Sequence, residues 1–158
     1  MLFRSYEGGI RVPFIVRWPG KVRPQSETDH VSVQYDLMAT VAEITGAPYR
    51  ETDGISFLPV LKGDASRQRE HPFLYFEYPE NGGQIAVRLG DWKGVKRNMR
   101  ADPHARWEIY DLKKDPAETT DLSDQYPDLI RRMNAVVQRE HQHPQIKEWE
   151  FIDPKFSK

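Results

Sequence analysis

The sequence predicts an α+β fold, in which an antiparallel sheet of three to four strands packs on a C-terminal helix. Two observations carry this prediction. Between residues 71 and 141, short runs of strand-forming residues alternate with turns rich in glycine, proline and aspartate. A longer segment follows in which apolar residues recur at helical spacing. The chain has 158 residues, which is enough for an ordinary domain with a real core.

The first 62 residues differ from the rest of the chain in their pattern of apolar and polar residues. A short apolar run at residues 14–16, between Pro13 and Pro19-Gly20, predicts a strand that is buried on both faces. Residues 30–35 show partial alternation of apolar and polar residues. Asp36 is expected to cap a helix that ends at Gly46. A strand buried on both faces needs strand neighbours, and the chain offers few, so this zone is expected to belong to a larger sheet.

The second zone contains the predicted antiparallel sheet. Strands are expected over residues 73–78, 84–89, 92–96 and 107–112, and Gly90-Asp91 should join the middle two as a hairpin. In the last strand, Trp107 and Ile109 should share one face, with Tyr110 and Leu112 on the other. Pro127 suits the first turn of a helix. The apolar stripe of that helix should pack on the core through Leu129, Ile130, Met133, Val136 and Val137.

Composition excludes several classes of function. The formal net charge is -1, so no global field attracts nucleic acid or an acidic membrane, and we expect no nucleic-acid partner. No segment approaches the ~20 apolar residues of a membrane span. The chain has no cysteine, which excludes disulfides, thiolate metal sites and cysteine nucleophiles together.

Several motifs, taken in order, resemble the C-terminal part of sulfatases of the arylsulfatase type, in the alkaline-phosphatase-like superfamily. The opening stretch Tyr6-Glu7-Gly8-Gly9-Ile10-Arg11-Val12-Pro13, followed by Trp18-Pro19-Gly20, carries most of this likeness. An aspartate-led helix ending in glycine comes next in the same order. The further matching motifs are Asp53-Gly54-Ile55-Ser56 with Pro59 and Leu61, Trp92-Lys93, Tyr110-Asp111-Leu112, and Asp115-Pro116-Ala117-Glu118 with Leu122.

The resemblance implies a domain division and an activity for a larger parent protein. Residues 1–62 would be the C-terminal end of the α/β catalytic domain, with its last strand and helix, and residues 63–158 the C-terminal subdomain. Such a parent would hydrolyse sulfate esters with calcium and a formylglycine nucleophile. This chain contains no matching Cys/Ser-x-Pro-Ser/Ala-Arg motif. We therefore expect no catalytic residue and no metal ligand here, and no activity from this chain alone. A bacterial parent would be exported to the periplasm or outside the cell.

Candidate substrate contacts are Arg4, Arg100 and His104. The resemblance places a sulfate-binding lysine about four positions ahead of the tyrosine, where this chain has Leu2; Arg4 is the nearby cation. Arg100 and His104 belong to a basic stretch from Lys93 to Arg106. That stretch could be a solvated hairpin and loop, a nucleic-acid surface, or a loop that contacts an anionic sulfated sugar, because guanidinium groups suit sulfate oxygens.

Glu7, Gly8, Gly9 and Arg11 could support a nearby active site or simply hold the loop through a Glu7–Arg11 ion pair. The two glycines are expected to provide close backbone packing or a positive φ rather than a phosphate-binding loop. The histidines are not expected to bind metal, since two histidines two positions apart, at residues 141 and 143, would point to different sides of a helix.

Two further interpretations stay open. The chain could be a non-catalytic binding or interaction module derived from a sulfatase, or part of a related phosphoryl or phosphonate ester hydrolase. The expected partners are the remainder of the catalytic domain and a sulfated carbohydrate or aryl sulfate. Because the cut edge of a sheet tends to find partners, the isolated chain is also expected to self-associate through the run at residues 14–16.

Overall fold

The computed structural model describes residues 5–50 and 52–153, which form two compact units. One unit combines the N-terminal residues up to Val12 with the chain from Pro72 onward, and the other spans Pro13–His71. These limits differ from the domain division at residues 62 and 63, which remains a prediction about the parent protein. In the described residues, no helix has both the length and the apolar composition required to span a bilayer.

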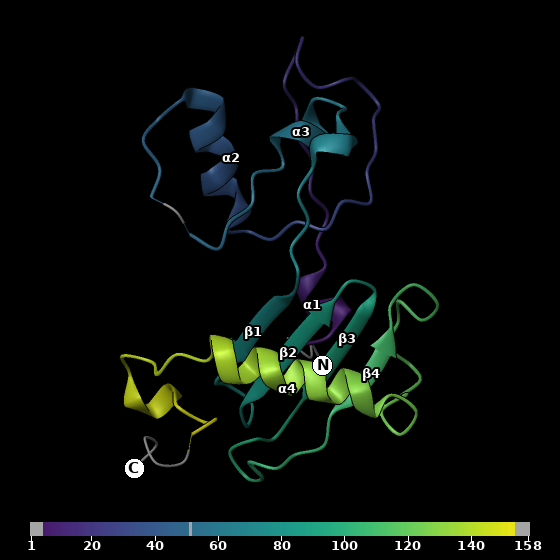
Figure 1. Ribbon diagram of the computed structural model, residues 1–158, viewed down its shortest axis with the longest axis vertical. Coiled ribbons are helices and arrows are strands. Elements are labelled where there is room, and N and C mark those ends of the chain that lie inside the picture. The colour runs from purple at the N-terminus through teal and green to yellow at the C-terminus, as the bar shows by residue number, and fades with distance from the viewer. Residues whose placement is uncertain (1–4, 51, 154–158) are drawn as a thin grey trace. The chain divides into compact units, whose positions relative to one another are not determined.

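The larger unit is built on a four-stranded antiparallel sheet in which neighbours in sequence are neighbours in space, in the order β1-β2-β3-β4 (Figure 1). The strands are β1 (Leu74–Tyr78), β2 (Gln84–Leu89), β3 (Trp92–Lys96) and β4 (Glu108–Asp111). Their positions agree with the predicted strands to within a residue or two, and Gly90 in the β2–β3 hairpin has the expected positive φ of 61°. The predicted sheet is confirmed.

Helix α4 (Pro127–Glu140) covers one face of this sheet. All five residues of its predicted apolar stripe belong to one core with Ile85, Val87 and Ile109. Gly94 of β3 is required here, because a Cβ atom at this position would lie 2.3 Å from the Met133 sulfur. The prediction that this stripe packs on the sheet is therefore confirmed.

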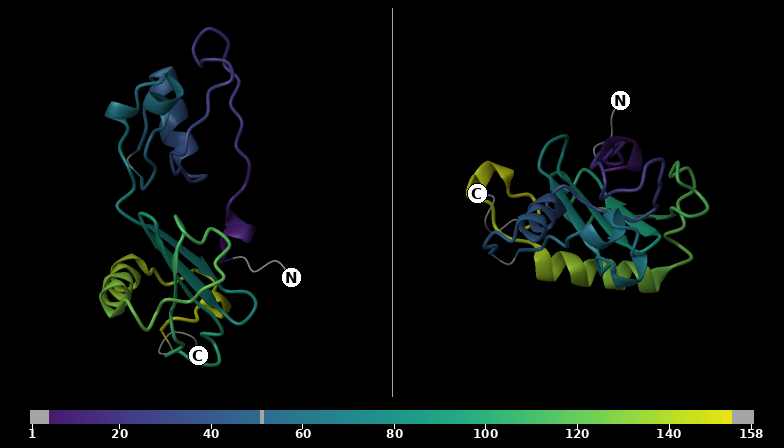
Figure 2. Two further views of the ribbon diagram at one scale, coloured as in Figure 1. Left: turned by 90° about the vertical axis from the view of Figure 1, so that its right-hand side faces the viewer. Right: turned by 90° about the horizontal axis from the view of Figure 1, so that it is seen from above.

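A short helix, α1 (Glu7–Ile10), lies on the opposite face of the sheet, as Figure 2 shows in its right-hand view. This face carries a second, smaller core of Ala86, Val95 and Tyr110, against which Tyr6 packs. As predicted, Trp107 and Ile109 join the core under α4, whereas Tyr110 joins the other one. Sequence reasoning described the opening stretch only as a glycine loop, so the helix was missed.

The smaller unit contains α2 (Asp36–Thr45), α3 (Leu58–Leu61) and the 3-10 turn η1 (Ala65–Arg67). Gly46 ends α2 with a φ of 68°, as predicted. Asp36, however, does not cap α2, because Tyr35 is the N-cap residue. The buried carboxylate of Asp36 instead accepts the backbone N–H groups of Val33 and Ile55, each at 2.8 Å, and contacts His71 Nε2 at 2.9 Å.

The strand predicted at residues 14–16 is wrong for this structure. Residues 13–35 contain no strand, and the side chains of Phe14 and Ile15 are 56% and 89% exposed. The apolar run was correctly identified, but a strand forms only where a neighbouring backbone pairs with it, and no described segment does so. The partial alternation at residues 30–35 forms no strand either, for the same reason.

Candidate functional site

The motif that opens the chain lies against the face of the sheet away from α4. We call residues 5–12 the docked segment. Ser5, fully buried, donates its hydroxyl to the Gln84 side-chain oxygen of β2 at 2.6 Å. Tyr6 packs edge-on to Tyr110 of β4, with ring centroids 6.0 Å apart. The docked segment is therefore tied to the sheet unit by contacts that span 79 to 104 positions of sequence.

A buried ion cluster fastens the docked segment. The side chain of Lys93 on β3 is only 1% exposed, and its Nζ lies 2.9 Å from Glu7 Oε1 and 3.0 Å from Glu118 Oε1. The contact to Glu118 is an ion pair rather than a directed hydrogen bond. Glu118 accepts the backbone N–H of Glu7 at 2.5 Å through its other oxygen. Arg88 approaches the second oxygen of Glu7 at 4.0 Å. One ammonium group thus holds two buried carboxylates.

The turn that carries Glu118 is shaped for this contact. Glu118 has a φ of 55°, a left-handed conformation that is unfavourable for a residue with a side chain. The Asp115 carboxylate accepts the backbone N–H groups of Thr119 and Thr120 at 2.8 and 2.9 Å, which stabilises the turn. Glu7, Lys93 and Glu118 come from three separate motifs of the sulfatase resemblance. The structure joins those motifs in one cluster.

A second polar group lies beside this cluster on β4. The carboxylate of Glu108 accepts hydrogen bonds from the hydroxyls of Tyr6 and Tyr110, the latter at 2.8 Å, and from Arg97, whose Nε lies 3.0 Å away. Burial, together with the hydrogen bond to the nearby Glu108 charge, raises the pKa of Tyr6 to about 12. The same two causes raise the pKa of Tyr110. Both phenols therefore stay protonated donors at ordinary pH.

The structure contradicts details of the roles predicted within the opening motif, and the predicted support of a nearby active site stays a prediction. The Glu7–Arg11 ion pair is wrong: Glu7 pairs with Lys93, a residue 86 positions away that no local pattern identifies, while Arg11 is exposed and only its backbone N–H bonds to Glu7. Gly8 has no positive φ, and a Cβ atom placed on it would meet nothing within 4 Å. Gly9 has no positive φ either. The predicted reasons for glycine are therefore wrong for Gly8, and the positive φ is wrong for Gly9.

The predicted substrate contacts lie apart from the docked segment or outside the described residues. Arg4 falls outside them. Arg100 directs its guanidinium group at backbone carbonyls, those of Pro79, Glu150 and Glu148 at 3.2, 3.3 and 2.5 Å. His104 is exposed on the same loop, with its backbone N–H bonded to Asp102.

The members of the basic stretch do not share one set of partners. Lys93 is buried with Glu7, Lys96 lies over the Trp107 ring at 5.3 Å, and Arg106 pairs with Asp124 at 3.0 Å. Side chains alternate between the two faces of the sheet along β3, so Lys93 and Lys96, three positions apart, lie on opposite faces. The stretch is therefore distributed over several local interactions.

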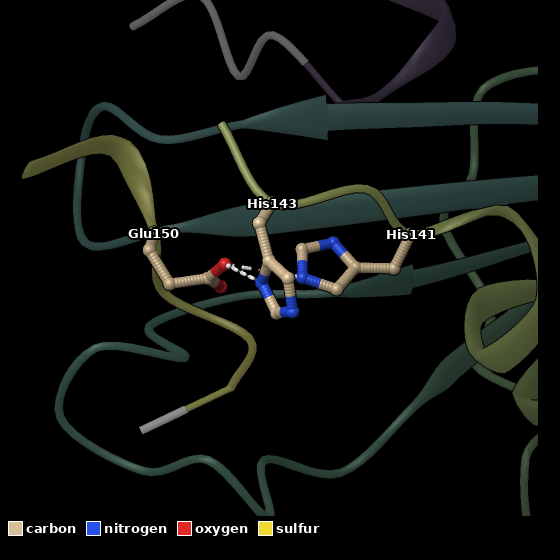
Figure 3. Close-up of side chains that lie close together, drawn as sticks. All are labelled: His141, His143 and Glu150. Atoms are coloured by element: carbon tan, nitrogen blue, oxygen red, sulfur yellow. Dashed lines mark hydrogen bonds and ion pairs between the residues drawn. The ribbon is translucent and has the colours of Figure 1, made fainter. Parts of the chain in front are cut away.

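The chain beyond α4 brings together three residues that sequence reasoning did not combine. His141, His143 and Glu150 place one ligand-type atom each within 4.8 Å of one another, and Figure 3 shows the two imidazole rings beside the carboxylate. Glu150 Oε2 lies 3.2 Å from His141 Nε2 and 2.9 Å from His143 Nδ1. The expectation that the two histidines point to different sides of a helix is wrong, because α4 ends at Glu140 and residues 141–144 are not helical. The sequence signal that could have indicated this cluster is a His-x-His pair just after the end of a helix.

The surroundings of Glu150 favour its charged form. Burial alone would raise the pKa of this carboxyl, but the hydrogen bond from His143, the backbone N–H groups of Asp153 and Ile152, and the nearby His141 together lower the pKa to about 2. The two backbone amides lie 3.0 and 2.8 Å from Oε1. Oε2 is the oxygen that faces the histidines.

Comparisons with known proteins agree with the motifs. The family model for N-sulphoglucosamine sulphohydrolase, C-terminal, matches residues 3–153. Human arylsulfatase A is 33% identical over 138 residues, which cover 75% of this chain and 27% of that protein. An N-acetylgalactosamine-6-O-sulfatase from Bacteroides thetaiotaomicron is 29% identical over 151 residues, covering 86% of this chain and 28% of the relative.

Solved structures show the same relationship. A sulfatase structure from work on the metabolism of multiple glycosaminoglycans by Bacteroides thetaiotaomicron superposes with a TM-score of 0.68 at 26% identity, covering 85% of this chain and 30% of that one. The chain thus spans less than a third of the length of these relatives. Its sheet and terminal helix correspond to the C-terminal part of sulfatases, which have the alkaline-phosphatase-like fold. The chain belongs to the family of N-sulphoglucosamine sulphohydrolase C-terminal domains.

Proposed function

We propose that this chain is the C-terminal part of a sulfatase that hydrolyses sulfate esters, and that it completes the fold and forms one wall of the substrate pocket. The observation that carries the proposal is the buried cluster of Glu7, Lys93 and Glu118. It ties the docked segment, where a catalytic domain would join the chain, to the sheet of the C-terminal unit. The family match over residues 3–153 supports the same assignment.

The residues of this chain do not fit the calcium ion and formylglycine that the family implies. The sequence has no cysteine and no Ser-x-Pro-Ser-Arg motif from which formylglycine could be made. Glu7 and Glu118 are the buried carboxylates of the docked-segment cluster, and Lys93 already neutralises them. We therefore assign the nucleophile and the calcium ligands of the parent to the rest of its catalytic domain.

Exposed apolar side chains support the presence of that larger partner. In the smaller unit, Phe14 and Ile15 are exposed, and α2 exposes Met38 to 67%. Large contiguous apolar patches on a protein surface are typical of interaction sites. We assign this surface to the remainder of the catalytic domain, because the relatives are more than three times as long as this chain. The exposed apolar residues of α2 are Leu37, Met38, Val41 and Ile44.

The loop that carries Arg100 and His104 is the part of the sheet unit that we assign to the pocket wall. Arg100 fixes the loop by binding three carbonyls, and its remaining N–H groups stay available for an anion. His104 is exposed beside it. A sulfated sugar is the substrate class that suits these donors, as in the relative named for N-acetylgalactosamine-6-O-sulfate.

The test uses the full-length reading frame. The parent should hydrolyse 4-nitrophenyl sulfate or a 6-O-sulfated N-acetylgalactosamine, and the 158-residue chain alone should not. His104→Ala in the parent should raise KM more than it lowers kcat, since it removes a binding contact. Arg131→Ala, on the exposed face of α4, is the matched control. Unchanged KM in His104→Ala would refute the wall assignment, and an inactive parent with an intact nucleophile motif would refute the sulfatase assignment.

The absence of a nucleophile motif in this chain also suits a non-catalytic module derived from a sulfatase. The upstream sequence separates the two functions, because only an enzyme needs the Cys/Ser-x-Pro-Ser/Ala-Arg motif and aspartate ligands there. An aryl phosphonate monoester serves as the third substrate in the same assay. Faster hydrolysis of that ester than of the sulfate esters would favour a related phosphonate ester hydrolase.

A further inference from the structure

The segment after α4 folds back so that His141, His143 and Glu150 face one another (Figure 3). Its 3-10 turn η2 (Lys147–Trp149) places Glu150 with its side chain only 1% exposed. The side chain of His143 is 48% exposed, so the cluster is buried at the carboxylate and open at one imidazole. An ion from solution can therefore reach it without unfolding of the chain.

His141 has a carboxylate on each side. Its Nδ1 lies 2.9 Å from Glu77 Oε1 on β1, while its Nε2 lies 3.2 Å from Glu150 Oε2. In a neutral imidazole only one nitrogen carries a proton. A proton held on Nδ1 by Glu77 leaves the Nε2 lone pair directed at the Glu150 oxygen. The two atoms therefore lie at a distance that a shared cation, either a proton or a metal ion, can bridge.

The groups around His141 and Glu150 orient these side chains in the way that outer-shell groups orient metal ligands. A carboxylate that accepts the far N–H of a ligating histidine fixes its tautomer and ring orientation, which is the position of Glu77. The backbone N–H groups of Ile152 and Asp153 hold Glu150 Oε1, so Oε2 remains directed at the histidines. His141 and Glu150 are thus both oriented by neighbouring groups of the same unit.

The spacing also fits a small divalent ion. With metal–ligand bonds of about 2.0–2.2 Å, the ligand atoms of a tetrahedral zinc site lie about 3.3–3.6 Å apart. The observed separations from Glu150 Oε2 are 3.2 and 2.9 Å, which is hydrogen-bond contact, so the side chains would move slightly apart to admit an ion. Imidazole nitrogens favour zinc and similar first-row ions, whereas calcium and magnesium prefer sites made of oxygen ligands only.

We propose that His141, His143 and Glu150 bind one first-row divalent transition-metal ion, with zinc as the typical occupant, and that Glu77 positions His141. Two histidines and one carboxylate leave the fourth coordination position to solvent. The ion closes the segment from residue 141 to 150 against β1. The site is separate from the calcium of the sulfatase family and does not depend on the proposed sulfatase function.

Metal titration of the 158-residue chain, stripped with a chelator beforehand, tests this proposal. Cobalt(II) should produce the visible absorption bands of a low-symmetry site and saturate at one ion per chain, and zinc should abolish those bands by displacement. Competition with a chromophoric chelator then gives the zinc Kd. A hundredfold excess of calcium should not displace the cobalt. Absence of saturable cobalt or zinc binding would overturn the proposal.

Variants assign the binding to these residues. His143→Ala and Glu77→Gln should each weaken zinc binding by roughly 10–100-fold, the first by loss of a ligand and the second by loss of the partner of His141. His30→Ala, in the smaller unit, is the matched control and should bind like the unmodified chain. Far-UV circular dichroism shows whether each variant is folded, and His143, being half exposed, is the position expected to tolerate substitution. Equal zinc affinities in folded His143→Ala and His30→Ala would refute the site.

Discussion

Lys93 is the residue on which the docking of the opening motif depends most. The substitution Lys93→Met keeps the length and burial of the side chain but removes the ammonium group. Glu7 and Glu118 would then stay buried, with side chains 9% and 3% exposed, and without the cation that lies 2.9 and 3.0 Å from them. Removing one member of a buried ion pair costs about 3–5 kcal/mol, because it leaves an uncompensated charge.

We expect Lys93→Met to lower the free energy of unfolding by this amount, measured by urea denaturation with circular dichroism and linear extrapolation. In a chain of this size the loss corresponds to a decrease in Tm of roughly 6–20 °C. Hydrogen exchange should accelerate at the amides of Gly9, Ile10 and Arg11, which bond within the docked segment. This local effect follows because the segment loses its anchor.

Two comparisons make the test decisive. Lys114→Met is the matched control, because Lys114 forms a pair with Asp111 but its side chain is 82% exposed, and such surface pairs contribute about 0–1 kcal/mol. The triple substitution Lys93→Met, Glu7→Gln and Glu118→Gln removes all three charges and should regain most of the lost stability. If Lys93→Met costs no more than Lys114→Met, the reasoning that the cluster anchors the segment is wrong.

Three further predictions concern other parts of the structure. Gly94→Ala should destabilise the sheet unit by about 1–3 kcal/mol in urea, since the new methyl group overlaps the Met133 sulfur; no change would show that α4 can move away at no cost. Asp36→Ala leaves the N–H groups of Val33 and Ile55 without acceptors and should cost about 2–4 kcal/mol, whereas equal stability would contradict the role of this carboxylate. Tyr6 has a pKa raised from 10.0 to about 12, so its contribution to stability is present below pH 10 and is lost as the pH rises toward 12; Tyr35 also has a pKa raised to about 12, so ultraviolet titration of Tyr6→Phe should lose one of the high phenol ionisations and keep the others.

The sheet unit shows which features local sequence patterns can predict. The strands of the central hairpin were identified to the residue because strand-forming runs flank Gly90, whose positive φ permits the tight turn. Helix α4 was found because its apolar residues recur on one face, and Pro127 stands in its first turn. These signals are local, so they need no knowledge of the rest of the chain.

Patterns that depend on a partner were less reliable. The run at residues 14–16 has the composition of a buried strand, but burial and pairing require a neighbouring strand that the described residues do not supply. Asp36 has the composition of an N-cap, but its carboxylate bonds to Val33, Ile55 and His71. In both cases the residue type was informative, and its interaction partner was not predictable.

The sequence by itself determined the α+β fold class, the four strands, the terminal helix and, through its ordered motifs, the relation to sulfatases. Only the tertiary structure decided which charged groups meet. The Glu7 carboxylate pairs with Lys93, 86 positions away, while its backbone N–H donates to the carboxylate of Glu118, 111 positions away. His141 lies between Glu77 and Glu150. The physical reason is that hydrophobic periodicity reports which face of an element is buried, whereas ion pairs and ligand sets are selected by the contacts that burial then imposes.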